Sequence, residues 1–179
     1  MSEKWDVLDL LSHTRHDWLN QIQLIKGNLA LNRLDRVEEV INDIINQTRH
    51  ESKLTNIGVP KLARKFLTFN WEDHSFELEF EVLGEVGHLT NAEDGLYEWC
   101  LHFFELIDQS CRLSAPNHLL VTLHLLESEN NRITFDFHGE LSDTTKVTEW
   151  LATKALLYER VSIMESYVEQ EEVVVTIKL

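Results

Sequence analysis

Basic residues are scarce in this chain of 179 residues. It contains 16 Lys and Arg against 31 Asp and Glu, which gives a formal net charge of −15. A protein of this charge repels phosphate backbones and anionic lipid surfaces. We therefore expect no nucleic acid and no membrane among its partners.

Long hydrophobic runs are also missing. No stretch approaches the roughly 18 consecutive apolar residues of a membrane-spanning helix. The first ten residues, MSEKWDVLDL, lack the basic start and the apolar core of a signal peptide. These absences predict a cytoplasmic protein.

Cysteine and glycine are few. The cysteine spacing argues against a disulfide, and the glycine spacing argues against a nucleotide-binding loop. Cys100 and Cys111 are eleven residues apart in one helical pattern, which is about three turns and too far for a disulfide. We expect both thiols to be reduced. The six glycines, at 27, 58, 84, 87, 95 and 139, form no Gly-x-Gly pair. Because glycine readily adopts the conformations that a phosphate-wrapping loop needs, the sequence predicts no competent nucleotide site.

The amino-terminal part, residues 1–56, is predicted to be a helical hairpin. From Leu8 to Leu29 apolar residues recur alternately every three and four positions, interrupted only by Arg15, as in helices that pack on other helices. A second helix follows a break near Asn32 and covers residues 35–53. A lone hairpin leaves much of its apolar surface in water, so we expect a homodimer that forms a four-helix bundle.

Residues 60–179 are predicted to form an α+β domain. The segment NIGVP, residues 56–60, has the composition of a linker. The alternation in FELEFEVLG predicts a half-buried strand, and a long helix follows with Asn91 as its cap. HLLVTLHLLE and RITFDFH read as strands joined at SENN, and a helix near residues 143–160 precedes two closing strands. The prediction is four or five strands with helices on one face.

The string RHDWLN, residues 15–20, supplies the candidate chemistry. At about 100° per residue, His13, His16, Asp17 and Asn20 fall on the half of the helix opposite its apolar face. Imidazole has an unperturbed pKa of about 6.5, so near neutral pH a ring nitrogen is available as a nucleophile. Such a nitrogen can accept and release a phosphoryl group. Asp17 would orient the ring or its proton, and Arg15 would attract an anion.

The same hairpin carries a local excess of positive charge. Residues 13–36 contain four basic and two acidic residues, a pattern that favours an acidic, phosphate-bearing partner. The residues expected to bind this partner are His13, Leu24, Lys26 and Arg33. A simple solvated face is the other interpretation of the charges, and Leu24 could instead pack within the protein. Zinc binding by His13, His16 and Asp17 is disfavoured because three ligands on one helical turn fit a tetrahedron poorly.

RHDWLN and its surroundings, LLSHTRHDWLNQIQLIKGNLAL continued by HESKL and FLTFNW, resemble the sporulation initiation phosphotransferase B family of spore-forming bacilli. The resemblance spans both parts of the chain and is strongest from Leu10 to about Trp71. It implies a dimeric helical hairpin followed by a domain like the ATP-binding domain of histidine kinases. His16 would take a phosphoryl group from an aspartyl-phosphate response regulator and pass it to the aspartate of a second regulator that controls sporulation. The regulator would hold the Mg²⁺, so no cofactor is expected in the chain itself.

A sensor histidine kinase would share the hairpin, so only the second domain can distinguish a kinase from a phosphotransferase. Kinases typically carry a Glu-x-x-Asp-Asn-Ala element, whereas ELIDQSC has Glu105, Asp108 and then Gln109 in place of the Asn. An ordinary amphipathic helix explains this stretch equally well. FDFHGEL retains Asp136 and Gly139 as a possible relic of an adenine site. We expect a phosphotransferase without autokinase or ATP hydrolysis activity. A kinase fragment that binds ATP and a non-catalytic dimeric adaptor for response regulators are the alternatives.

Overall fold

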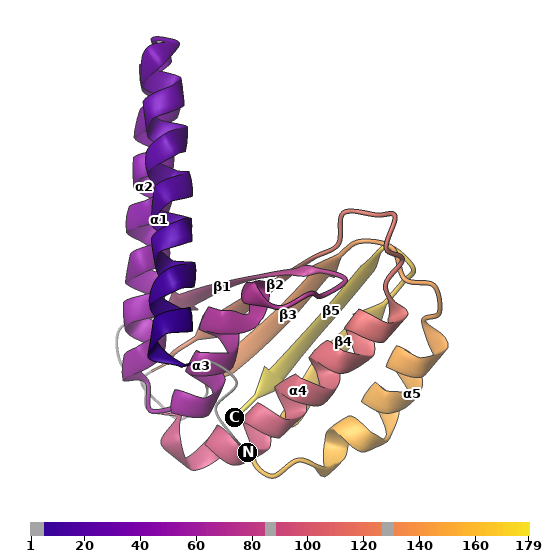
Figure 1. Ribbon diagram of the computed structural model, residues 1–179. Coiled ribbons are helices and arrows are strands. Elements are labelled where there is room, and N and C mark those ends of the chain that lie inside the picture. Colours follow the sequence, from indigo (N-terminus) through magenta and orange to yellow (C-terminus); the bar gives the residue numbers. More distant parts are fainter. Residues whose placement is uncertain (1–5, 85–88, 127–130) are drawn as a thin grey trace. The chain divides into compact units, whose positions relative to one another are not determined.

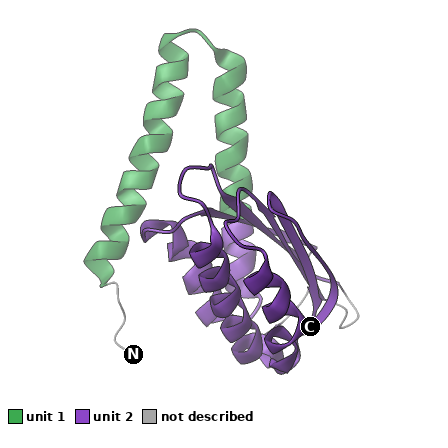
Figure 2. Cartoon of the chain, turned by 90° about the vertical axis from the view of Figure 1, so that its right-hand side faces the viewer, with its two compact units in different colours: residues 1–49 green, residues 50–179 purple. Residues whose placement is uncertain are grey.

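The computed structural model describes residues 6–84, 89–126 and 131–179. It divides into two compact units, residues 1–49 and 50–179 (Figure 2). The division falls inside the second helix, because the last turns of that helix belong with the second unit. There Leu54 is fully buried, His50 accepts the Val82 backbone N–H and Lys53 donates to the Gly84 carbonyl.

The first unit holds the predicted pair of helices, α1 (Val7–Ala30) and the start of α2 (Leu34–Asn56). A capping box between Asp6 and Asp9 begins α1, since each carboxylate accepts a backbone N–H of the other residue. Asn32, with a φ of 53°, makes the turn between the helices. No residue of α1 is buried. No helix in the described part of the chain is both long and apolar enough to cross a membrane.

The second unit is built on a five-stranded mixed sheet. Its strands are β1 (Glu77–Leu83), β2 (His118–His124), β3 (Arg132–His138), β4 (Ser162–Val168) and β5 (Glu172–Lys178), in the order β1-β2-β3-β5-β4. Only the β1–β2 pair is parallel among these strands. Three helices cover one face of the sheet (Figure 1), namely α3 (Pro60–Thr68), α4 (Glu93–Ser110) and α5 (Thr145–Ala152). The predicted α+β class is confirmed.

The core lies between the helices and the covered face of the sheet. The alternating burial of β3 places Phe135 and Phe137 in the core, and the α4 side chains Trp99 and Phe103 pack against Phe135. Short 3₁₀ turns occupy Phe69–Trp71, Thr90–Ala92 and Lys154–Leu157.

Three details of the predicted elements differ from the structure or lie outside it. Asn91 is not the cap of α4, because it lies within the turn Thr90–Ala92, and α4 starts at Glu93 with no side-chain cap. The helix expected near residues 143–160 is shorter and ends at Ala152. Most of the SENN turn lies outside the described residues, which resume at Asn131.

Both cysteines are free thiols. Burial raises the pKa of Cys100 well above its ordinary value. Burial and the nearby charge of Asp108 raise the pKa of Cys111 to about 12. A thiol protonated at neutral pH is a poor nucleophile, so neither cysteine is a candidate for covalent catalysis.

Candidate functional site: the His16 face of α1

His16 stands on the amino-terminal half of α1 with 73% of its side chain exposed. Its Nδ1 lies 3.2 Å from Nδ2 of Asn20, one helical turn along. The same Nδ1 lies 3.6 Å from Oδ1 of Asp17. Nε2 forms no hydrogen bond or ion pair with the residues that the structure describes, and with most of the side chain exposed the ring is accessible to another protein.

The two neighbours of His16 act on its tautomers in opposite directions. A nucleophilic Nε2 requires the ring proton to be on Nδ1, because only the unprotonated nitrogen has an available lone pair. The Asp17 carboxylate, at 3.6 Å, is too far for a hydrogen bond, but its negative charge favours the Nδ1–H tautomer electrostatically. The amide nitrogen of Asn20 is a donor and, as oriented, favours the other tautomer, although amide orientation is assigned from the network of contacts. Of these two neighbours, the Asp17 carboxylate is the one whose charge favours a proton on Nδ1.

The other candidate residues of the hairpin are spread along it. His13 is half-buried, whereas Arg15 is exposed and takes no part in the contacts of His16 with Asp17 and Asn20. Leu24 is 54% exposed and lies about 12 Å along the helix axis from His16, at 1.5 Å per residue. Lys26 is exposed about 15 Å along the axis.

Arg33 is exposed at the end of the turn between the helices, while the Arg36 guanidinium pairs with the Glu39 carboxylate, which compensates its charge. Within residues 13–36, the basic residues that form no ion pair with a described residue are therefore Arg15, Lys26 and Arg33. The group His13, His16 and Asp17, at which zinc binding is disfavoured, is not among the described side-chain groups whose ligand atoms converge for a metal ion.

The stretch on α4 that resembles a kinase motif has a structural role. The Asp108 carboxylate accepts the Ser75 backbone N–H and contacts Nδ1 of His74 at 3.1 Å. His74 in turn stacks on the Phe69 ring, with 3.8 Å between centroids. These contacts fix the segment before β1 to α4. This role was not predictable from the sequence. Ser75 and His74 lie 33 and 34 residues from Asp108, and no motif links them to it.

Asp108 should contribute to stability as an ionised group. Burial opposes its ionisation, but the hydrogen bonds from Ser75 and His74 outweigh burial and lower the pKa of Asp108 below its ordinary value. We expect Asp108→Asn to lower the free energy of unfolding by about 1–2 kcal/mol at pH 7, measured by urea denaturation. The exposed neighbour Glu105, changed to Gln, is the control and should cost under about 0.5 kcal/mol.

The pH dependence of this effect has a defined sign. A lowered pKa in the folded state stabilises the protein above the unfolded-state value of about 3.9, and the contribution is lost as pH falls through the folded-state pKa. The difference between Asp108→Asn and the wild type should therefore shrink in strong acid. A difference that grows on acidification would contradict this assignment.

Asp136, the possible relic of an adenine site, lies on the face of the sheet away from the helices. Its neighbours Phe135 and Phe137 are buried on the covered face, and successive side chains of a strand point to opposite faces. Asp136 Oδ1 lies 3.1 Å from Nε2 of His138 on the same strand. The aspartate therefore belongs to the open face of the sheet, apart from α4.

Two family descriptions together match the full chain. Residues 1–57 match "sensor kinase SpoOB-type, alpha-helical domain", and residues 58–179 match "sporulation initiation phospho-transferase B, C-terminal". Sporulation initiation phosphotransferase B of Bacillus subtilis (strain 168) is 39% identical over 175 residues, which covers 97% of this chain and 90% of the relative.

A solved structure of the histidine kinase ThkA in complex with the response regulator protein TrrA also matches. The match covers 95% of this chain and 60% of the kinase chain, with 12% sequence identity and a TM-score of 0.39. This chain thus spans about three fifths of that kinase chain.

Proposed function

Because the chain belongs to the sporulation initiation phosphotransferase B family, we propose that His16 carries a phosphoryl group between two response regulators. Membership of this family makes the chain a phosphotransferase of a sporulation phosphorelay. The observation that supports His16 as the carrier is its exposed Nε2, with Nδ1 flanked by Asp17 and Asn20. The relay would run in the cytoplasm.

The proposed reaction has two symmetrical steps. Nε2 of His16 attacks the phosphorus of an aspartyl phosphate on the first regulator, the N–P bond forms, and the electron pair of the broken O–P bond leaves with the regulator's carboxylate. In the second step an aspartate of the next regulator attacks the same phosphorus, and the electron pair of the N–P bond returns to Nε2. Throughout, the proton stays on Nδ1, where the charge of Asp17 would stabilise it.

The chain itself is proposed to bring no metal to this step. The described side chains in contact with His16 offer one carboxylate and one amide, whereas Mg²⁺ needs near-octahedral oxygen coordination. The acidic pocket of a receiver domain would supply the ion, which would neutralise charge on the phosphoryl oxygens during transfer. Arg15, Lys26 and Arg33 would attract the acidic receiver, and His13 and Leu24 would lie in its contact area.

We propose that the hairpin forms a homodimeric four-helix bundle. In the single chain Leu8, Trp18 and Ile22 are 73%, 50% and 54% exposed, although all three belong to the apolar face predicted to be buried. Contiguous apolar surface of this kind marks a protein interface. A second copy of the hairpin offers the same surface and covers it by symmetry.

The proposed function is tested by phosphoryl transfer from a receiver domain. The purified chain is mixed with a receiver that carries a radiolabelled aspartyl phosphate. The expected result is acid-labile, base-stable label on the chain, as for a phosphoramidate. Complex formation without any label on the chain would support the adaptor function instead.

Asp17 should be the neighbour on which the transfer rate depends most. Because it favours the reactive tautomer, Asp17→Ala is expected to slow transfer from the receiver by about 100-fold, measured by rapid-quench kinetics. Asn20→Ala should have a smaller effect, because the Asn20 amide favours the unreactive tautomer.

Glu38→Ala removes an exposed carboxylate from α2 and is the control, with an unchanged rate expected. A larger loss of rate for Asn20→Ala than for Asp17→Ala would show that the proton assignment on His16 is wrong.

Incubation with ATP and Mg²⁺ alone should leave the chain unlabelled. Asp108 is held by Ser75 and His74, and Gln109, which stands where kinases carry the Asn, contacts Glu105 at 3.2 Å. The measurement is acid-labile incorporation from labelled ATP, with a phosphorylated receiver as the positive control. Incorporation that depends on His16 would support the kinase-fragment alternative.

A further inference from the structure

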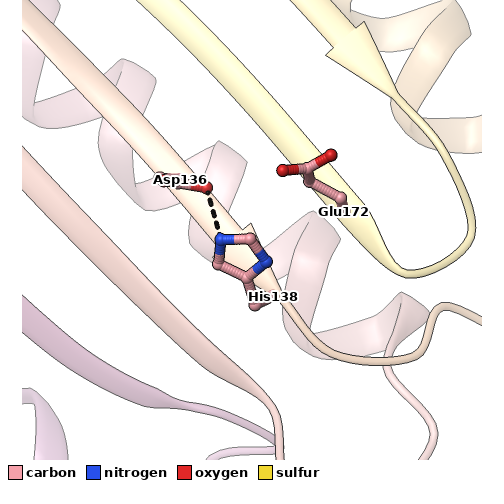
Figure 3. A group of neighbouring side chains, drawn as sticks. All are labelled: Asp136, His138 and Glu172. Carbon is pink, nitrogen blue, oxygen red and sulfur yellow. Dashed lines mark ion pairs between the residues drawn. The ribbon is translucent and has the colours of Figure 1, made fainter.

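Three potential metal ligands lie together on the open face of the sheet. Asp136 and His138 come from β3, and Glu172 is the first residue of β5 (Figure 3). One ligand atom from each residue can be chosen so that all three lie within 4.8 Å of one another. The group is separate from the His16 face, which belongs to the other unit.

The backbone holds the three residues in fixed positions. His138 and Glu172 are directly paired in the antiparallel register of β3 and β5, and the Gly139 N–H donates to the Glu171 carbonyl at 3.1 Å. The Glu140 N–H donates to Oδ1 of the buried Asn117 at 2.8 Å. Because a Cβ at Gly139 would lie 2.3 Å from that Asn117 oxygen, glycine is required at this close approach. Ligands on paired strands are more precisely placed than ligands on loops.

The contact between Asp136 and His138 is incomplete as a hydrogen bond. The Asp136 side chain is 36% exposed, but its Oδ1 atom is buried and has no hydrogen-bond partner among the described residues, although His138 Nε2 lies only 3.1 Å from it. An acceptor buried without a donor is costly. In a tetrahedral zinc site with bonds of about 2.0 Å, two ligand atoms are separated by about 3.3 Å. The Asp136–His138 separation of 3.1 Å is within the range of a hydrogen bond and also fits two ligands of one metal ion.

We propose that Asp136, His138 and Glu172 bind one Zn²⁺ ion. Rotation of the Glu172 side chain would bring its carboxylate to the ion, and water would complete the tetrahedron. An imidazole ligand favours a transition metal over Mg²⁺ or Ca²⁺, which prefer oxygen ligands. The two carboxylates neutralise the ion, and the net charge of −15 attracts cations generally. The bound ion would join β3 to β5 at this end of the sheet.

Zinc titration of the metal-free full-length chain tests the site. The probe is Zn²⁺ alone, measured by competition with a chromophoric chelator at neutral pH. We expect one ion per chain, and we expect His138→Ala and Glu172→Gln each to weaken binding by about tenfold or more. Asp136→Asn, which keeps the shape of the side chain, should also weaken binding. Mg²⁺ at the same concentration should not compete.

His118→Ala is the matched control. His118 lies opposite His138 on β2 and pairs with Glu79 at 3.1 Å, so its loss should leave zinc affinity unchanged. His16→Ala should also leave it unchanged. Circular dichroism establishes that each variant is folded. With free zinc at about 100 times its Kd, the melting temperature of the wild type should rise by about 5 °C or more, and that of His138→Ala should not.

The proposal is overturned by any of three results. The first is no stoichiometric zinc binding by the wild type. The second is wild-type affinity in either His138→Ala or Glu172→Gln. The third is an equal loss of affinity in His118→Ala, which would place the ion elsewhere on this face.

Discussion

Replacement of His16 by alanine should abolish phosphoryl transfer to the chain. The label that moves from a phosphorylated receiver to the wild type should not appear on His16→Ala, because the variant has no nitrogen at the position where the N–P bond forms. An acceptor residue is not replaced by its neighbours, so the loss should be complete rather than partial. The measurement is the amount of acid-labile label on the chain after incubation with the receiver.

The controls separate chemistry from folding and docking. The His16 side chain is 73% exposed, so its truncation should change neither the helical content nor the mass of the assembled protein in solution. Because His13 lies one turn away on the same helix, His13→Ala is the matched histidine control. It should still accept label, although more slowly, since His13 is proposed to lie in the contact area of the receiver. Full labelling of His16→Ala would show that another residue is the acceptor.

A charge on the apolar face of α1 should dissociate the dimer. Ile22 is 54% exposed in the single chain and lies in the centre of the predicted apolar face. Burying a side chain of this size contributes about 1.5–3 kcal/mol, whereas burying an unpaired carboxylate is strongly unfavourable. Light scattering should give twice the chain mass of 21.0 kDa for the wild type and the single mass for Ile22→Glu.

Gln23→Glu is the matched control for this experiment. It adds the same charge to an exposed position of α1 that turns away from the apolar face by about 100°, so the dimer should persist. Circular dichroism tests whether Ile22→Glu keeps its helices. A wild-type chain that is monomeric at micromolar concentration, or a dimeric Ile22→Glu variant, would contradict the proposed bundle.

The helices and strands with strong periodicity were predictable from the sequence. The three-and-four spacing from Leu8 to Leu29 gave α1, and the alternation around Leu78 gave β1. Local signals were less informative. Asn91 has the side chain of a helix cap, but the chain enters α4 through a 3₁₀ turn, so its side chain caps nothing. The unit boundary falls within α2 because Leu54 is buried in the second unit, and such tertiary contacts leave no trace in helical periodicity.

The candidate sites also differ in how far the sequence predicts them, because local spacing is visible in a sequence and long-range contact is not. His16, Asp17 and Asn20 lie within five residues on one helix, so the helical repeat alone brings them together, and the structure places Asp17 and Asn20 at the ring. The zinc group was not predictable, because Glu172 meets His138 only through the register of β3 and β5. The His74 contact of Asp108 is another long-range contact of this kind.

The most direct test of the relay is a single-turnover transfer from the phosphorylated chain. The wild type is labelled by a first receiver, separated from it, and mixed with an unphosphorylated second receiver and Mg²⁺. We predict that label leaves His16 and appears on the aspartate of the second receiver in equal amount. Label that remains on the chain, or is released only as inorganic phosphate, would contradict a relay through His16.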